Sequence, residues 1–231
     1  MTTATATHNR VRIVHDSNDH GGSRSWDNLG TMVTWHDRYN LGDDRPSDDS
    51  ATWMRDLAAE LVNAEDAELI PDDHVRAILD KHVVMLPLYL MDHSGLSMSV
   101  GGFSCPWDSG QVGYIYCTLK DARVNWMNAD AQWDTVLTDH ENKPITMREY
   151  TDRVLRGEVE TYDQDLRGDV YGFVLETGET SETGGGVEWE QGDSCFGFYG
   201  TDPAENGMMD HIGDAVTLDQ VREAFNNIEY I

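Results

Sequence analysis

The chain has 231 residues, of which 39% are hydrophobic and seven are tryptophan, which suits one large domain, or a domain with an appendage, with a packed core. This composition argues against global disorder, and no apolar run approaches the roughly 20 residues that a membrane span needs. The 43 acidic and 16 basic side chains give a net charge of −27, which disfavours direct binding of nucleic acid, because phosphate contacts need Lys or Arg.

The acidity has two competing explanations. Carboxylates spread over a folded surface can imitate DNA and attract DNA-binding proteins. The alternative is solubility in the salty cytoplasm of a halophile, which the 28 Asp against 15 Glu and the 13 Arg against 3 Lys partly favour. A GC-rich genome explains the Arg excess but not the whole acid excess. The sequence leaves both explanations open.

The N-terminal residues and the cysteines bear on location. The first ten residues, MTTATATHNR, contain no apolar signal region, so we expect no secretion. Three cysteines is an odd number and none forms a CxxC pair, which favours reduced thiols in a cytoplasm. We expect residues 1–10 to form a flexible N-terminus and residues 11–231 to form a single domain, because no stretch resembles a linker.

Four helices are predicted from apolar stripes at helical spacing. Two of them begin with a capping box, formed by Thr146 with Glu149 and by Thr217 with Gln220. Gly157 lies inside the longest helix, where glycine is unfavourable. The predicted helices are residues 51–64, residues 71–82, residues 146–167 and the segment that follows Thr217.

The strands are predicted from alternation and from apolar runs between turn residues. The central feature is a hairpin with an elaborated loop over residues 83–119, in which Pro87 marks an edge or a bulge. Residues 120–140 are predicted to be packed and partly helical, and residues 178–186 to be a flexible acidic loop. The other predicted strands are residues 11–15, 31–36, 169–176, 187–190 and 194–199, the last two separated by a turn at Gly192. The pattern predicts an α+β fold with a mainly antiparallel sheet packed by several helices.

The hairpin loop holds the densest set of reactive side chains. A thiol near an imidazole can act as a nucleophile, so Cys105 with His93 is a candidate catalytic pair, with Asp92 or Asp108 to orient the base. The alternative for Cys105 is a small residue packed beside a turn. Trp107 lies on the same loop and is a candidate for an exposed binding side chain.

A metal site is a second possibility. His36, Asp37 and His93 are the candidate ligands, and Asp43, Asp44 and Asp108 add hard oxygen ligands. No zinc-finger spacing, HExxH motif or calcium-loop motif accompanies them, and chance clustering is expected among so many aspartates. We therefore expect no cofactor. The glycine run at 184–186 lacks a phosphate-binding motif and is interpreted as a flexible connection.

The acidic surface is a third kind of candidate site. The outer face of the predicted helix over residues 146–167 carries five carboxylates that can form a binding surface for a protein that normally binds DNA. A solvated helix face is the simpler interpretation. The five residues are Asp152, Glu158, Glu160, Asp163 and Asp165.

Three segments together resemble a family of uncharacterised proteins carried by bacteriophages and other mobile elements. They read DNLGTMVTWHDRYNLGD at 27–43, FSCPWDSGQVGYIY at 103–116, and GEVETYDQDLRGDVYGFVLE with DSCFGFYG at 157–176 and 193–200. The resemblance implies an accessory protein in the cytoplasm of a host cell, and it implies no reaction, cofactor or site residue.

Three hypotheses follow. The first is an accessory protein that binds and inhibits a host or defence protein, in one version by imitating DNA, with no membrane and no direct nucleic-acid contact. The second is a small hydrolase or transferase, which predicts a pocket where His36, His93, Cys105 and Asp108 converge. The third is a structural or regulatory protein whose acidity serves only solubility or salt adaptation. The sequence leans towards the first and away from an enzyme.

Overall fold

The computed structural model describes residues 7–17, 22–180 and 186–230 of the chain. Two compact units are present. The terminal unit comprises Met1–Gly21 and Gln164–Ile231, and the central unit comprises Gly22–Asp163. The sequence predicted one domain, and the boundary at residue 164 falls inside a long helix where no change of composition marks it. Each unit has its own sheet, and the sheets are antiparallel except for one short parallel pair, which confirms the predicted α+β class.

The central unit is built on a four-stranded sheet with the order β2-β5-β3-β4. The predicted hairpin is confirmed, because β3 and β5 pair in antiparallel register and β4 lies within the connection between them. The strands are β2 (Thr31–Thr34), β3 (Val83–Asp92), β4 (Leu96–Ser99) and β5 (Ser109–Thr118).

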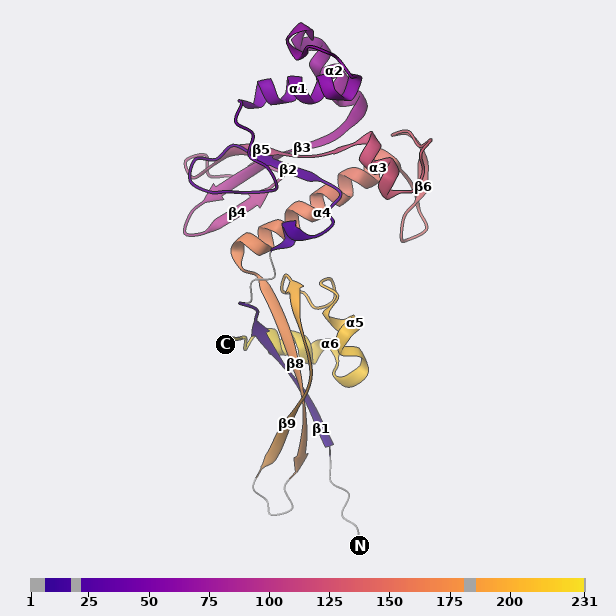
Figure 1. Ribbon diagram of the computed structural model, residues 1–231. Helices are drawn as coiled ribbons and strands as arrows, with labels where there is room; N and C mark the ends of the chain where they lie inside the picture. The colour runs from indigo at the N-terminus through magenta and orange to yellow at the C-terminus, as the bar shows by residue number, and fades with distance from the viewer. Residues whose placement is uncertain (1–6, 18–21, 181–185, 231) are drawn as a thin grey trace. The chain divides into compact units, whose positions relative to one another are not determined.

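Helices cover both faces of this sheet (Figure 1). On one face, Trp53 of α1 (Ser50–Val62) packs against Tyr114 and Tyr116 of β5, and α2 (Asp72–His82) packs beside α1. On the other face, α4 (Met147–Arg167) places Leu155 beside Ile115. The alternation of β5 residues 114, 115 and 116 between the two faces follows from the period of two along a strand.

Pro87 lies in β3, which is an interior strand of the sheet. It pairs with Tyr114 of β5 on one side, whereas the pairing with β4 begins only at Tyr89. Pro87, which has no N–H to donate, therefore lies where β3 has no partner on its β4 side. The register shift against β5 lies immediately after it, between Leu88 and Tyr89. The sequence predicted that this proline marks an edge or a bulge. The strand as a whole is interior, but at Pro87 itself one side is unpaired and an irregularity follows.

The remaining elements of the central unit surround this core. Residues 120–140 were predicted to be packed and partly helical, and they contain most of α3 and a short strand. Trp126 packs edge-on against Tyr150 of α4, with ring centroids 4.3 Å apart. The elements are α3 (Leu119–Asn125), β6 (Val136–Thr138), β7 (Pro144–Thr146) and the short 3₁₀ helices η1 (Ser23–Ser25) and η2 (Ala67–Leu69).

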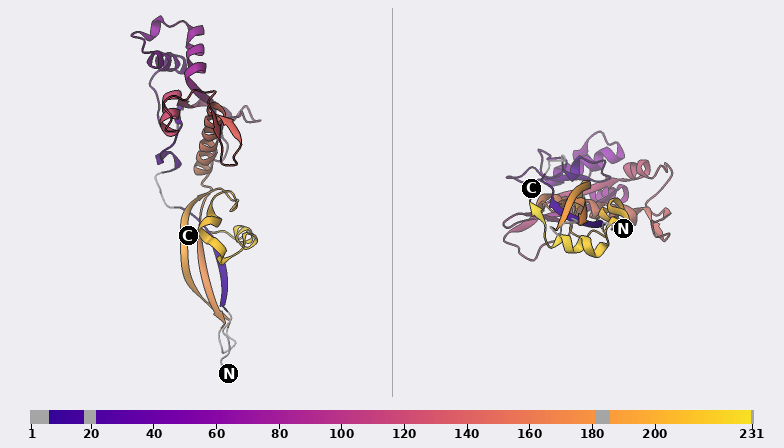
Figure 2. Two further views of the ribbon diagram at one scale, coloured as in Figure 1. Left: turned by 90° about the vertical axis from the view of Figure 1, so that its right-hand side faces the viewer. Right: turned by 90° about the horizontal axis from the view of Figure 1, so that it is seen from below.

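The terminal unit has a second sheet with the order β10-β1-β8-β9. Helices α5 and α6 lie against one of its faces, where Phe173 and Phe198 pack with Met208 and Val221 (Figure 2). The elements are β1 (Thr7–His15), β8 (Val170–Thr180), β9 (Val187–Tyr199), β10 (Glu229–Tyr230), α5 (Met208–Ile212), α6 (Leu218–Phe225) and the 3₁₀ helix η3 (Gly213–Ala215). The predicted capping box at Thr217 and Gln220 is formed.

Two predictions in this unit are corrected. Residues 7–10 are strand and not a flexible end, because they pair with β8, and Arg10 also forms an ion pair with Glu176 at 2.6 Å. Strand β9 is continuous through Gly192, because two register shifts against β8 absorb its extra residues as bulges. Of the predicted loop at 178–186, residues 178–180 belong to β8, and residues 181–185 lie outside the described part of the chain.

Gly157 allows a direct test of the α4 assignment. Apart from its chain neighbours and the backbone of α4 itself, no atom of the described residues lies within 4 Å of the position that a Cβ would take there. We expect Gly157→Ala to raise the free energy of unfolding by about 0.5–1 kcal/mol in urea denaturation, because glycine costs that much inside a helix. Gly30→Ala is the contrasting variant and should destabilise, since its Cβ would lie 2.4 Å from Leu155. A destabilised Gly157→Ala protein would contradict the helix assignment.

Candidate functional site

The ends of β3 and β5 bring the predicted reactive loop together. Asp92 is the last residue of β3, and its N–H donates to the Asp108 carbonyl at 2.8 Å, one residue before β5 begins. The tight β3–β4 turn follows Asp92 and includes Ser94 at φ 59°. The antiparallel register of β3 and β5 therefore places the Asp92–His93 pair beside the Cys105–Asp108 segment.

Asp108 is the meeting point of the three residues predicted to be catalytic. His93 Nδ1 lies 3.0 Å from Asp108 Oδ2, and Cys105 Sγ lies 3.6 Å from the same oxygen. The Ser109 hydroxyl donates to the Cys105 carbonyl at 2.6 Å and closes the turn that carries the thiol. His93, Cys105 and Asp108 thus converge on one carboxylate oxygen.

The spatial arrangement of His93, Cys105 and Asp108 differs from that of a thiol nucleophile with an imidazole base. Such a pair needs the sulfur within hydrogen-bond reach of the imidazole, with the carboxylate behind the ring. Here the carboxylate stands between the other two groups, and the Cys105 thiol donates to Asp108. The arrangement makes His93 and Cys105 two supports of the Asp108 carboxylate.

Asp108 also lines a cavity of about 330 Å³, which we name the Asp108 cavity. Its polar wall combines two carboxylates, Asp92 and Asp108, with Arg38 and His36. Trp107 stands at the cavity and is 92% exposed. His93 and Cys105 do not line the cavity and reach it through Asp108. The full lining is His36, Arg38, Leu90, Asp92, Trp107, Asp108, Ser109, Gly110 and Val112.

The two carboxylates are held in the same way. Asp92 Oδ2 accepts from Arg38 and, at 3.3 Å, from the Tyr39 hydroxyl, whereas Asp108 Oδ2 meets His93 and Cys105. Within the described residues, neither Oδ1 atom has a hydrogen-bond partner. Each carboxylate therefore has one oxygen fixed by the protein and one available to a water or a ligand.

His36 has a defined tautomer in this setting. Its Nδ1 accepts from the backbone N–H groups of Arg38 at 3.3 Å and Tyr39 at 3.2 Å, and its ring stacks on Tyr39 with centroids 5.1 Å apart. A neutral His36 must then carry its proton on Nε2. Nε2–H is a hydrogen-bond donor on a side chain that lines the cavity.

The predicted metal ligands do not assemble. His36 lines the Asp108 cavity and His93 contacts Asp108, but Asp37 is exposed and does not line the cavity. The Asp43 carboxylate is bound by Arg24. In the part of the chain that the structure describes, no group of three His, Cys, Asp or Glu side chains is placed to hold a metal ion.

Two carboxylates of the predicted acidic surface have structural roles. Glu158 is only 11% exposed, forms an ion pair with Arg24 at 3.0 Å and accepts the N–H of Leu29 at 2.7 Å. Asp163 accepts the N–H of Met98 at 2.7 Å and so anchors β4. These side chains tie α4 to the strands and loops around it, and they are not free to imitate phosphates.

The other three carboxylates of the predicted acidic surface differ in exposure and in ion pairing. Asp152 forms an i,i+4 ion pair with Arg156 at 2.7 Å, and Asp165 is half-buried. Glu160 is exposed. The acidic face of α4 is therefore not a continuous row of free carboxylates. The sequence could not reveal this, because the partners come from distant segments.

The three thiols differ in accessibility. Cys117 is buried in β5, and its burial, together with the nearby charges of Asp121 and Glu158, raises its pKa to about 12. Cys117 is therefore inert as a nucleophile at neutral pH. Cys105 and Cys195 are half-buried, and all three cysteines are free thiols, as the sequence predicted.

Comparisons with family models, with curated proteins and with solved structures give no match for this chain. Among the described residues, no helix combines the length and apolar character needed to cross a bilayer.

Proposed function

We propose that the chain is a hydrolase of small polar molecules, with the Asp108 cavity as its active site and Asp108 as the general base. The observation that carries this proposal is the Asp108 carboxylate, with Oδ2 held by His93 and Cys105 and Oδ1 without a partner among the described residues. A general base needs a fixed carboxylate within hydrogen-bond reach of a water, and this arrangement supplies one.

The proposed reaction adds water across a bond of the substrate. Asp108 Oδ1 takes a proton from a water molecule while the water oxygen bonds to the electrophilic atom. The bond to the leaving group then breaks, and the leaving group receives the proton from Asp108. Arg38 and His36 Nε2–H are the donors placed to stabilise negative charge that develops on the substrate. His93 and Cys105 act as positioning residues.

The cavity also restricts the substrate. A volume of about 330 Å³ lies at the small end of ligand pockets, so the site suits a compact molecule. The polar and charged side chains of the wall favour hydroxyl, amide or ester groups on the substrate. The exposed ring of Trp107 offers one apolar surface for a flat face of the same molecule.

Trp107 provides the first test of this site. Chromogenic p-nitrophenyl esters, phosphates and glycosides would be offered to the purified protein. We expect saturable turnover of at least one class, and in Trp107→Ala we expect KM to rise about tenfold with kcat little changed, because the ring contributes only binding. Trp26→Ala is the matched control, since Trp26 is also exposed, at 50%, but does not line the cavity.

Two results would oppose the proposal. One is the absence of turnover above the buffer rate for all three substrate classes. The other is an equal rise of KM in the Trp26 and Trp107 variants, which would place binding elsewhere.

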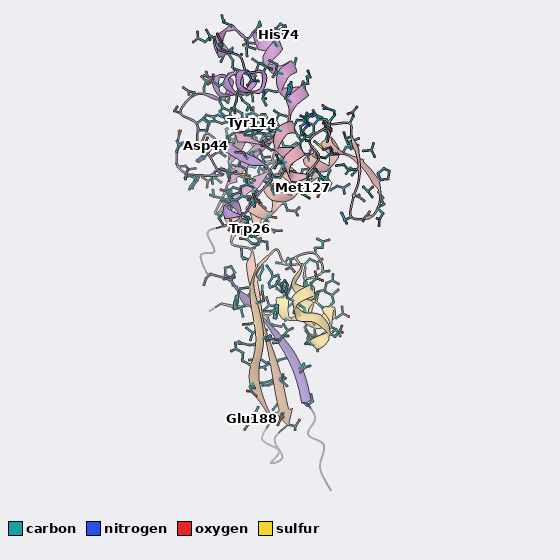
Figure 3. The ribbon with its side chains drawn as sticks, turned by 45° about the vertical axis from the view of Figure 1, so that its right-hand side comes forward. Trp26, Asp44, His74, Tyr114, Met127 and Glu188 are labelled. Carbon is teal, nitrogen blue, oxygen red and sulfur yellow. The ribbon has the colours of Figure 1, made fainter. Side chains whose placement is uncertain are left out.

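A second candidate function is favoured by a different surface. Between Asp43 and Asp80 the chain has 12 acidic and 3 basic residues, and every one of the acidic residues is exposed. Most of them lie on α1, α2 and their connection, where Figure 3 labels His74. We propose that this segment, named the acidic hairpin, is where a basic host or defence protein would bind if the chain acts as an accessory protein through its charge.

The acidic hairpin is tested by salt and by charge-matched variants. We expect host DNA-binding proteins to be captured at about 50 mM salt and released at about 500 mM, where the Debye length is less than half of the roughly 10 Å found at 0.1 M. The triple variant Asp56→Asn, Glu60→Gln, Glu65→Gln should lose capture. The triple variant Glu188→Gln, Glu190→Gln, Asp193→Asn changes the charge equally in the terminal unit and should keep it. Capture that ignores salt, or that is lost equally in both variants, would contradict this function.

A further inference from the structure

A larger cleft lies in the central unit, on the sheet face that α1 and α2 cover. Its volume is about 530 Å³, within the range of small-molecule sites. Figure 3 labels Tyr114, whose ring belongs to this cleft and comes from β5. The apolar part of the lining is Ala51, Met54, Val75, Leu79, Val83, Met85, Pro87 and Tyr114. We name this site the helical cleft.

Three arginines from three different helices line the helical cleft. Arg55 comes from α1, Arg76 from α2 and Arg148 from α4, and the acidic residues in the lining are Asp72 and Asp80. Arg55 forms an ion pair with Asp72. Residues 72, 76 and 80 are spaced four apart on α2, so their side chains lie along one face of that helix. The charged groups therefore line the α2 side of an otherwise apolar cleft.

Arg148 is a fixed cation that has no carboxylate partner in the part of the chain that the structure describes. Its guanidinium donates to the carbonyls of Asp80 at 2.6 Å and Val83 at 3.3 Å, and it lies 5.1 Å from the centre of the Trp133 ring. The two carbonyls belong to the C-terminal end of α2, where helix carbonyls need donors. This role accounts for the orientation of Arg148 but leaves its charge uncompensated.

Arg76 has no such role. It is exposed and has no hydrogen-bond or ion-pair partner among the described residues. This is unusual in a chain with 43 acidic and 16 basic side chains, in which nine of the 13 arginines pair with a carboxylate. Four arginines have no carboxylate partner among the described residues, and two of them, Arg76 and Arg148, line the same cleft.

The end of α2 also carries further positive charge. The pKa of His82 is lowered, first by burial and then by the charges of Lys81 and Arg123. Neither Lys81 nor Arg123 pairs with a carboxylate within the described residues. The region around the C-terminal end of α2 is therefore locally rich in cations, although the protein as a whole is strongly acidic.

We propose that the helical cleft binds a small organic anion, whose carboxylate or phosphate lies between Arg76 and Arg148 and whose apolar body covers Leu79, Met85 and Tyr114. This site is separate from the Asp108 cavity and does not depend on the proposed hydrolysis. Guanidinium groups favour carboxylate and phosphate because their planar donors match two oxygens at once. The apolar floor selects against inorganic anions and against fully polar ligands.

The test uses two fluorescent probes of similar shape. 8-Anilinonaphthalene-1-sulfonate carries an anionic group on an apolar body, and N-phenyl-1-naphthylamine has almost the same body without the charge. We expect the sulfonate to bind the folded protein and Arg76→Gln to weaken its binding about fivefold, with binding of the neutral probe unchanged. Arg45→Gln is the matched control, because Arg45 is also exposed and its side chain has no partner among the described residues, but it lies outside the cleft.

The controls separate a specific site from the overall charge. Equal weakening by Arg45→Gln and Arg76→Gln would show a long-range charge effect and overturn the proposal. So would a sulfonate affinity that Arg76→Gln leaves within about twofold of the original, or a wild-type protein that binds neither probe. Circular dichroism of each variant confirms that the probe reports on folded protein.

Discussion

Replacement of Arg24 by methionine is expected to lower the free energy of unfolding by about 3 kcal/mol, because it leaves two carboxylates without their common partner. Arg24 is only 10% exposed and contacts Asp43 and Glu158 together. Its pKa is raised above the ordinary value by hydrogen bonds and charge attraction from both carboxylates, which outweigh the opposing effect of burial. The guanidinium also donates to the Gly30 carbonyl at 2.6 Å. The network therefore joins η1, the loop before β2 and α4.

Arg156→Met is the matched control for this prediction. Arg156 pairs with Asp152 at 2.7 Å on the outer face of α4, and its side chain is 51% exposed. Its loss should cost no more than about 0.5 kcal/mol, as is usual for exposed i,i+4 pairs. Urea denaturation of both variants gives the comparison. A loss below about 1 kcal/mol for Arg24→Met would show that the network is no stronger than a surface ion pair.

Asp108→Asn is expected to reduce kcat/KM by at least about 100-fold on whichever p-nitrophenyl class the protein hydrolyses, because it removes the general base and keeps the shape of the side chain. Asp37→Asn is the control, since Asp37 is exposed and does not line the cavity. Fold stability of the Asp108 variant should remain close to that of the original, since Asp108 lies on a partly exposed loop.

The two positioning residues should give smaller losses. We expect His93→Gln to lower kcat by about tenfold with KM little changed, because the free oxygen of Asp108 remains in place but is less firmly oriented. Cys105→Ser keeps a donor to Asp108 and should retain most of the activity, which a cysteine nucleophile would not allow. A Cys105→Ser protein as inactive as Asp108→Asn would replace the proposed base mechanism with nucleophilic catalysis by the thiol.

Local signals were sufficient for most helices and for the central hairpin. The apolar stripe of α4 and the capping box at Thr217 depend on residues within a few positions of one another, so a single sequence contains them. Strand β9 was divided at Gly192 because glycine usually marks a turn. Its continuity depends on pairing with β8, in which bulges absorb the extra residues, and only the tertiary structure reveals that pairing.

The candidate site was predictable only in part, because some of its contacts join residues that are distant in sequence. His93, Cys105 and Asp108 lie within 15 positions of one another, and the hairpin register brings them together. Arg38 and Tyr39 were missed, although both contact Asp92, because they are more than 50 positions away and no motif connects them.

The role of the acidic side chains on α4 was also hidden from the sequence, because their partners come from other segments of the chain. Composition established the net charge, but it could not separate solvated carboxylates from carboxylates that hold the fold together. Glu158 and Asp163 belong to the second group, as their contacts with Arg24 and with Met98 N–H show. Exposed carboxylates such as Asp56, Glu60 and Glu65, on α1 and the connection that follows it, remain available to a partner.

The central claim is that His93 is tied to the cavity through Asp108, and nitrogen NMR of the His93 ring tests it most directly. At about pH 8, where an ordinary imidazole is neutral, we predict a proton on Nδ1 in the original protein, because that nitrogen faces the Asp108 carboxylate. Asp108→Asn should shift the ring towards the Nε2–H form that free imidazole side chains prefer. The same mixture of tautomers in both proteins would show that the two side chains do not interact, and the proposed site would lose its support.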